Sequence, residues 1–202
     1  MTDINLIHKD EDRELVTLCR KGDADAFEIL ARNYQKKMFN IAFRITGSME
    51  DASEVVQDAF VSAYRNLKHF EQKSRFSTWL YSITVNTAKN RLKQNLTRKA
   101  HEPHSYDDPL YSDSNTKRIA PASEDPSALD LIMEKDRQKG VQECLNRLEQ
   151  DFREVIVLRD IQGFAYSEIA AMLSLAEGTV KSRLFRARDA VKACLKKLLG
   201  EW

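Results

Sequence analysis

The sequence predicts an all-α fold made of two small helical domains, and three observations lead to that prediction. Only six glycines and four prolines occur among 202 residues, of which 42% are hydrophobic and 31% charged, a composition typical of soluble helical proteins. Apolar residues recur at intervals of three and four over most of the chain, which is the spacing of one helix face. All four prolines lie within residues 103–126, where helical spacing is absent, so we expect a flexible linker there.

The linker divides the chain into a domain of residues 1–97, the linker itself at 98–126, and a domain of residues 127–202. Each domain is long enough to bury a core of its own. The net charge of +1 conceals strong polarisation, because residues 65–99 carry nine Lys or Arg against one Asp or Glu, whereas residues 100–135 carry three against eight. A basic surface is the electrostatic footprint of phosphate binding, so the charge pattern indicates a nucleic-acid partner.

Helix start and stop signals predict four helices in each domain. In the first domain Gly22 stops the first helix, Asp23 is a suitable N-cap for the second, and Gly47 ends it. In the second domain Gly163 separates two helices from a final pair whose short turn gives the layout of a helix-turn-helix. The expected helices span residues 10–20, 24–45, 49–66 and 77–96, and then 127–148, 152–160, 167–173 and 177–199.

The last helix contains TVKSRLFRAR, residues 179–188. At 100° per residue Val180, Leu184 and Ala187 share the core stripe, whereas Phe185 points away from it. The second helix of a helix-turn-helix enters the major groove, where Arg pairs with guanine, Ser with either base, and Phe packs on a thymine methyl. A basic face that is merely solvated is the alternative interpretation. The candidate duplex contacts on this helix are Thr179, Lys181, Ser182, Arg183, Phe185 and Arg186. Among the basic residues, Lys181, Arg183 and Arg188 lie on the flanks and suit phosphates, which set register without reading sequence.

The fourth helix and the loop before it have the side chains that bind unpaired bases. Aromatic rings stack on bases, Asn hydrogen-bonds base edges, and Lys or Arg contacts phosphates. The candidate residues are Lys73, Arg75 and Phe76 in the loop, and Trp79, Ser82, Asn86, Lys89, Asn90 and Lys93 on the outer face of the helix. Core packing is the alternative explanation for Phe76 and for Trp79, but it does not account for two asparagines among lysines on an outer face.

Cysteine and histidine usage argues against catalysis, cofactors and metals. Cys19, Cys144 and Cys194 are odd in number and far apart, and each lies at or beside an apolar helical position, so we expect reduced structural thiols and neither a disulfide framework nor a zinc cluster. The four histidines form no metal-binding or nucleophilic constellation. No apolar run approaches the ~18 residues of a membrane span, and the N-terminus lacks the features of a signal peptide, so the expected location is the cytoplasm.

A protein that reads duplex DNA with one domain and unpaired bases with the other is expected to recognise promoters. Two rival interpretations stay open on the residues alone. An ordinary duplex-binding regulator would join the helix-turn-helix to a sensing or dimerising domain, and it gives no reason for Trp79, Asn86 and Asn90 on one basic face. A protein-interaction adaptor would use its charged faces on acidic proteins and would show no sequence preference on DNA.

Six motifs, in this order along the chain, resemble the extracytoplasmic-function (ECF, group IV) sigma factors of bacterial RNA polymerase, and most nearly the sigma-E-like branch. These motifs are KGDADAF, DASEVVQDAFVSAY, FSTWLYSITVNTAKN, REVIVLRD, GFAYSEIAAML and GTVKSRLFRAR. The resemblance implies a sigma region 2 bundle followed by a sigma region 4 helix-turn-helix. It further implies a dissociable sigma subunit that directs transcription initiation without covalent chemistry.

The resemblance also implies the partners. Region 2 would dock on the β′ clamp helices of core RNA polymerase and region 4 on the β flap, while the acidic linker would follow the polymerase channel toward the RNA exit. The loop of residues 66–76, with Asn86 and its neighbours, would capture a flipped minus-10 base. A minus-35 element of the GGAAC kind would be read by Lys181, Ser182, Phe185 and Arg186. An anti-sigma factor would cover both domains and would hold the protein at the inner membrane. The candidate polymerase contacts are Asp51, Glu54, Gln57 and Asp58.

Three positions depart from the family pattern, and all of them affect turns. Ala165 stands where the family often has a Ser N-cap, which leaves Glu168 as half of a capping box and costs about 1 kcal/mol unless Ser167 takes over. Ser174 replaces the usual turn glycine, and a left-handed backbone there would also cost about 1 kcal/mol. Glu149 replaces a common proline, so the preceding helix is expected to run on beyond residue 148.

Overall fold

The structure is a computed structural model that describes residues 4–72, 74–101 and 128–199, and side chains over residues 12–72, 74–98 and 136–198. The described part is all-helical, which confirms the predicted fold class. The first domain contains α1 (Ile4–Arg20), α2 (Ala24–Thr46), α3 (Met49–Asn66), a 3-10 turn (Leu67–His69) and α4 (Phe76–His101). The second contains α5 (Ala128–Asn146), α6 (Gln150–Ile156), a π-helical turn (Val157–Ile161), α7 (Tyr166–Leu173) and α8 (Glu177–Leu199). The predicted linker lies almost wholly outside the described residues.

Side-chain and glycine caps fix the ends of α2 and α3. The Asp23 carboxylate accepts a hydrogen bond from the Ala26 amide at 3.1 Å, as the sequence predicts for an N-cap. Gly47 ends α2 with a left-handed φ of 76°, a conformation that only glycine adopts without strain. The Ser48 hydroxyl then caps α3 by accepting from the Asp51 amide at 3.2 Å. The two long helices are therefore joined by a turn of only two residues.

The core of the first domain lies between α2, α3 and α4. The inward-facing apolar side chains of these three helices are almost fully buried: Leu30, Met38, Ile41 and Ile45 from α2, Val55 and Ala59 from α3, and Leu80 and Val85 from α4. Burying a large aliphatic side chain contributes roughly 1.5–3 kcal/mol. Packing of these stripes therefore stabilises the bundle far more than the caps do.

The second domain buries an unbroken apolar run, Val155–Leu158, together with Ile169 on α7 and Val180 and Leu184 on α8. Two of the predicted turn features are confirmed. The Ala165 amide donates to Glu168 Oε2 at 2.9 Å, which is the half capping box, and Ser174 has a left-handed φ of 55°. A non-glycine residue in that conformation costs about 1 kcal/mol.

The prediction that α5 runs on past residue 148 is wrong, because α5 ends at Asn146. Glu149 has extended backbone angles (φ −57°, ψ 147°) and is the N-cap residue of α6. The Arg153 guanidinium donates to the Asn146 and Leu148 carbonyls at 2.7 and 3.0 Å. These carbonyls have no partner within the helix once α5 ends, so a side chain from the following helix stabilises the break.

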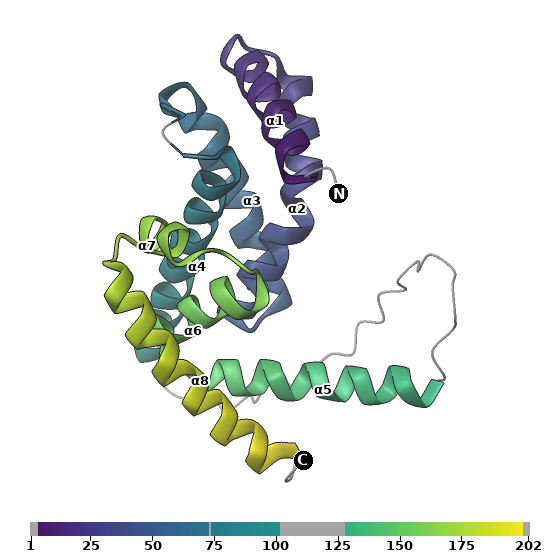
Figure 1. Cartoon of the computed structure of the whole chain (residues 1–202), viewed down its shortest axis with the longest axis vertical. Helices are drawn as coiled ribbons and strands as arrows, with labels where there is room; N and C mark the ends of the chain where they lie inside the picture. The colour runs from purple at the N-terminus through teal and green to yellow at the C-terminus, as the bar shows by residue number, and fades with distance from the viewer. Residues whose placement is uncertain (1–3, 73, 102–127, 200–202) are drawn as a thin grey trace.

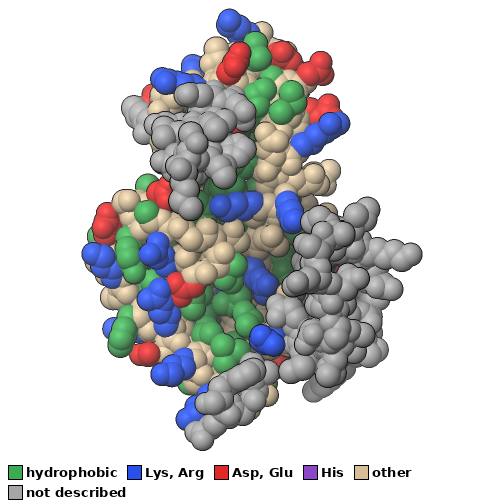
Figure 2. All heavy atoms as spheres, turned by 45° about the vertical axis from the view of Figure 1, so that its right-hand side comes forward, with side chains coloured by type: hydrophobic (Ala, Val, Ile, Leu, Met, Phe, Trp, Pro, Cys, Tyr) green, Lys and Arg blue, Asp and Glu red, His purple; other side chains and the backbone are tan. Residues whose placement is uncertain are grey.

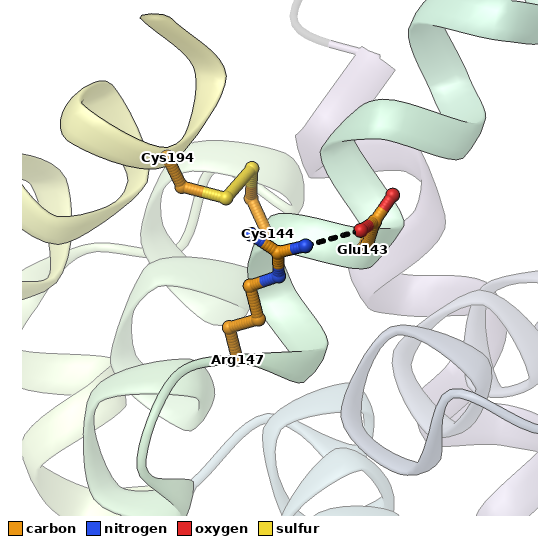
Figure 3. Close-up of a disulfide and its surroundings, with 4 residues drawn as sticks. All are labelled: Glu143, Cys144, Arg147 and Cys194. Atoms are coloured by element: carbon orange, nitrogen blue, oxygen red, sulfur yellow. Dashed lines mark hydrogen bonds and ion pairs between the residues drawn. A yellow bond between two sulfur atoms is a disulfide. The ribbon is translucent and has the colours of Figure 1, made fainter. Parts of the chain in front are cut away.

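The expectation of three reduced cysteines is wrong for two of them. Cys144 on α5 and Cys194 on α8 form a disulfide with their Cα atoms 5.7 Å apart, as Figure 3 shows, whereas Cys19 is free and buried. Helical register predicted burial correctly for Cys144 and Cys19. Helical register does not tell which side chain of a distant helix a buried cysteine meets. The two bridged cysteines are 50 positions apart, so their pairing depends on how α5 and α8 pack.

The two domains pack against each other, with α6 and α7 beside α2 and α4 (Figure 1). The Tyr81 ring of α4 lies 5.4 Å from the Phe164 ring, and Lys37 Nζ lies 4.7 Å from the centre of the Phe164 ring. Arg153 Nη1 donates to the Ile45 carbonyl at 2.7 Å. A Cβ at Gly47 would come within 2.5 Å of the Asn146 side chain. The chain therefore adopts a closed arrangement that a linker alone does not predict.

A buried carboxylate lies at this interface between the domains. Glu154 is 1% exposed, and its carboxylate accepts hydrogen bonds from Gln150 Nε2 at 2.9 Å and from Lys89 Nζ of α4 at 3.1 Å. Burial raises the pKa of Glu154 above its ordinary value of 4.5, and the interactions with Gln150 and Lys89 offset only part of that rise. The acid form is consequently favoured by folding.

We predict that Glu154 makes stability fall as pH rises. Between pH 4.5 and the higher pKa of the folded state, the folded protein binds more protons than the unfolded one, so the free energy of unfolding decreases with rising pH across that window. In Glu154→Gln this contribution is absent. Urea unfolding from pH 4.5 to 7 should give a flatter profile for Glu154→Gln than for the wild type, with exposed Glu28→Gln as the control. Parallel profiles would contradict the prediction.

Candidate nucleic-acid interface

The helix-turn-helix presents the face that the sequence predicts. Val180, Leu184 and Ala187 are 1% exposed or less, whereas the adjacent Phe185 is 68% exposed. The short helix α7 packs on the N-terminal half of α8 and fixes this division between the two sides. Of the other candidates Lys181, Ser182 and Arg186 are exposed, and Thr179 and Arg183 are half-buried. The structure therefore brings a large aromatic ring, a hydroxyl and two cations onto one open helix face.

Two of the predicted phosphate contacts are engaged within their own domain. Arg183 Nη2 lies 2.6 Å from Asp151 Oδ2. Arg188 donates to both carboxylate oxygens of Asp160 at 2.9 and 2.6 Å, and these hydrogen bonds raise the pKa of Arg188. In this state Arg183 joins α8 to α6 and Arg188 joins α8 to the π-helical turn. Their contact with phosphates stays a prediction.

The outer face of α4 is only partly as predicted. Asn86, Asn90 and Lys93 are exposed and lie within about two helical turns of one another. Lys89, in contrast, reaches across to Glu154 in the second domain, so this side chain is engaged here and its phosphate contact stays a prediction. The reason is the closed arrangement, which a pattern within one helix does not reveal.

The aromatic residues before and within α4 belong mainly to the core. Phe76 is 5% exposed and contacts the rings of Tyr34 and Phe70 at 5.7 and 6.0 Å, so its prediction as a base-stacking residue is corrected. The first turn of α4 is covered by α2 and by the loop, which places Phe76 inside. Trp79 is half-buried and its ring is stacked on Phe70 at 4.8 Å.

The remaining loop candidates have mixed outcomes. Arg75 is exposed and Ser82 is half-buried, and the Ser82 hydroxyl donates to the Trp79 carbonyl at 2.7 Å. Lys73 lies outside the described residues. An open cleft of about 930 Å³ lies next to the loop, and both domains line it, with Arg13, Lys37 and Arg75 among its residues.

The acidic face of α3 is divided between paired and exposed groups. Asp51 accepts from Arg91 Nε at 2.8 Å and from Asn95 at 3.0 Å, and Glu54 forms an ion pair with the same arginine. These contacts join α3 to α4. Gln57 and Asp58, the other two candidate polymerase contacts, are exposed. The predicted acidic face is therefore half-neutralised by its own domain.

The sequence interpretation missed Tyr81, Arg153 and Glu154, which hold the closed arrangement. One signal was available, because REVIVLRD places a charged pair directly before an apolar run. Adjacent buried charges require partners. The identity of those partners, Lys89 and the Ile45 carbonyl, comes only from the fold.

Charge on the visible face is dispersed. In Figure 2 lysine and arginine side chains are interspersed with hydrophobic and acidic ones. Among the residues that the structure describes, no group of three His, Cys, Asp or Glu side chains could hold a metal ion. Within the same residues no helix is both long and apolar enough to cross a membrane. The geometry of the site is that of a binding surface built from two helices.

A helical bundle with exposed asparagines on a basic helix, followed by an open helix-turn-helix face, defines a two-domain DNA-binding protein. Comparison with known families gives its class. Residues 30–97 match the model of Sigma-70 region 2, and residues 138–191 match that of Sigma-70, region 4. The chain belongs to the sigma-70 family, and within it to the ECF sigma factors, as the relatives below show.

Two curated relatives cover nearly the whole chain. The RNA polymerase sigma-H factor of Pseudomonas aeruginosa is 34% identical over 97% of this chain and all of its own length. The ECF RNA polymerase sigma-E factor of Escherichia coli K12 is 38% identical over 89% of this chain and 92% of its own length. The resemblance inferred from six motifs is thereby confirmed.

Two solved structures have the same fold. The structure of CnrH in complex with the cytosolic domain of CnrY matches with a TM-score of 0.67 and 26% identity, covering 93% of this chain and 99% of that one. The sigma factor RpoE in complex with the anti-sigma factor NepR from Bartonella quintana matches with a TM-score of 0.63 and 25% identity, over 84% and 96%.

Proposed function

We propose that this protein is a dissociable sigma subunit that binds core RNA polymerase and directs transcription initiation from specific promoters. It reads a minus-35 element as duplex and a minus-10 element as melted bases. The observation that carries the proposal is the exposure of Phe185 beside buried Leu184 on α8, together with exposed Asn86 and Asn90 on α4. The protein acts by binding, and no covalent step is assigned to it. Its site of action is the cytoplasm, where RNA polymerase and DNA are found.

The α8 face supplies the chemistry for minus-35 recognition. Exposed Arg186 pairs with guanine in the major groove, Ser182 bonds either base, and Phe185 packs on a thymine methyl. Lys181 contacts a phosphate, which sets the register without reading sequence. The Ser182 hydroxyl donates to the Thr179 carbonyl at 3.0 Å, so its oxygen stays available as an acceptor.

The outer face of α4 supplies the chemistry for the minus-10 element. Asn86 and Asn90 present amide groups that bond the edges of unpaired bases, and Lys93 contacts the backbone. The stacked pair of Phe70 and Trp79 borders this face and supports the loop that precedes it. Because Phe76 is buried, its role is to support the loop, and Trp79 offers only its exposed part to a base.

The partners follow from the exposed surfaces and from the relatives. Gln57 and Asp58 on α3 are the residues that we assign to the β′ clamp helices, and the second domain would contact the β flap. Both structural relatives were solved with a partner, one of which is named as an anti-sigma factor. An anti-sigma factor is therefore part of the proposal, with both domains as its target.

Promoter reading requires the closed arrangement to open. In the structure Lys89 is paired with Glu154, and Arg183 and Arg188 are paired with Asp151 and Asp160. Separation of the domains releases Lys89 toward phosphate. We assign the separation of the domains to the binding of core polymerase, because the polymerase would hold the two domains at the spacing of the two promoter elements.

Run-off transcription tests the function directly. With purified core polymerase and a candidate promoter, the protein should produce a specific transcript that neither component gives alone. Sequence-specific duplex binding that does not depend on core polymerase, with no transcript, would favour the rival duplex-binding regulator. Absence of any sequence preference on DNA would favour the rival adaptor.

We predict that Arg186→Ala weakens minus-35 discrimination by about 1–3 kcal/mol, which is the contribution of one bidentate contact to guanine. Arg186 is exposed, so the variant should fold normally. Competition binding between matched and mismatched minus-35 duplexes measures the effect, with exposed Lys192→Ala on the same helix as the control. An unchanged base preference in Arg186→Ala would refute the assigned role.

We predict that Asn86→Ala lowers run-off activity on a duplex promoter by about fivefold, since one hydrogen bond to a base contributes about 1 kcal/mol. The loss should be partly rescued on a promoter whose minus-10 region is already unpaired. Glu28→Ala is the control, because Glu28 is exposed in the same domain and its ion pair is with Arg32 of the same helix. Equal loss of activity on both templates would show that Asn86 has a structural or polymerase-docking role instead.

A further inference from the structure

The three cysteines differ in burial. Cys144 is 1% exposed, whereas its disulfide partner Cys194 is only half-buried, so Cys194 is the more accessible side of the bridge. Figure 3 shows Arg147 beside Cys144, with its guanidinium directed to Glu143. Cys19 is buried in the other domain and is not bridged. Burial raises the pKa of Cys19, which makes it an unreactive internal control.

The disulfide holds the part of α8 that otherwise packs weakly. The fully buried side chains of this helix, Val180, Leu184 and Ala187, all lie in its first half. After Val191, the described side chains are exposed except for half-buried Cys194 and Leu195. The covalent bond to α5 is therefore the main anchor of residues 192–198.

Through α5 the disulfide also connects α8 to the first domain. Gln142, two residues before Cys144, accepts a hydrogen bond from Arg44 Nη1 of α2 at 3.1 Å. Asn146, two residues after Cys144, lies against Gly47 at the end of α2. The bridge thus joins the DNA-reading helix to a helix segment that is docked on the other domain.

A disulfide at this position calls for an explanation other than structural support. Where cellular thiols are kept reduced, disulfides are rare and are mostly transient or redox-sensing. This step rests on the proposed function, which places the protein with RNA polymerase in that compartment. A bridge between a half-buried residue, Cys194, and a buried one, Cys144, fits a reversible disulfide, because thiol exchange requires access from at least one side.

We propose that Cys144 and Cys194 form a redox modification site, whose disulfide is reduced by a dithiol and formed again by a peroxide. In reduction, a thiolate of the reductant attacks Cys194 Sγ, the S–S bond breaks, and Cys144 leaves as a thiolate that takes up a proton. The second thiol of the reductant then displaces Cys194, which is released as a thiol while the reductant becomes a disulfide.

Oxidation proceeds in two displacements. The Cys194 thiolate attacks a peroxide oxygen, the O–O bond breaks, and a sulfenic acid and hydroxide form. The Cys144 thiolate then attacks the sulfenic sulfur and displaces a second hydroxide, so that two electrons pass from the two sulfurs to the peroxide. In the oxidised protein the disulfide fixes residues 192–198 of α8 to α5. In the reduced protein these residues are released from α5.

The experiment uses the full chain, treated with dithiothreitol and then with hydrogen peroxide. Alkylation of the denatured protein, read by mass spectrometry, should add three labels to the reduced chain and one to the oxidised chain, because the sequence contains three cysteines. Hydrogen exchange in residues 192–198 should be about tenfold slower in the oxidised state. The Cys19→Ala variant should lose two labels on oxidation as the wild type does, passing from two labels to none, and Cys194→Ser should show neither the loss of labels nor the change in exchange.

Two results would overturn the proposal. One is three labels before and after peroxide, and the other is exchange in residues 192–198 that does not depend on the thiol state. The Cys19→Ala variant excludes a contribution from the third thiol. This test is separable from the test of the proposed function. A failed run-off assay would not change the label counts or the exchange rates. A cysteine pair that does not react would not change transcription by the reduced protein.

Discussion

The buried guanidinium of Arg153 connects three backbone ends that no helix satisfies by itself. It donates to the Ile45 carbonyl in the last turn of α2, to the Asn146 carbonyl that ends α5, and to the Leu148 carbonyl in the following turn. Terminal helix carbonyls need partners, and a buried cation needs hydrogen bonds to offset the loss of hydration. These three bonds use Nη1 and Nη2 of Arg153 and hold α5 and α6 against the end of α2, while its buried Nε has no partner among the described residues.

Several of the cations that promoter DNA would use are paired with carboxylates in this structure. Lys89 is paired with Glu154 across the interface between the domains, whereas Arg183 and Arg188 are paired within their own domain. Ion pairs with solvent access contribute only about 0–1 kcal/mol each, so a phosphate can replace a carboxylate at small cost. Glu154 is different because it is buried, and loss of Lys89 leaves the Gln150 hydrogen bond but removes the ion pair that offsets part of the cost of burying its charge. The interface can therefore be both specific and reversible.

The two halves of α8 are held by different means. The first half is fixed by apolar packing of Val180 and Leu184, and this packing orients Phe185 outward. The second half depends on the bond between Cys194 and Cys144. A DNA-reading face can thus stay ordered while the rest of its helix changes its attachment to α5.

The sequence by itself determined the fold class, the bounds of α3 and α8, the caps at Asp23 and Gly47, and the outward direction of Phe185. Each of these follows from the 3.6-residue period or from a turn that only certain residues adopt, and such information is local. The tertiary structure alone decided that Phe76 is buried, that Lys89 meets Glu154, and that Cys144 meets Cys194. Periodicity gives the face of a helix on which a side chain lies, whereas the neighbour that it meets depends on how distant helices pack.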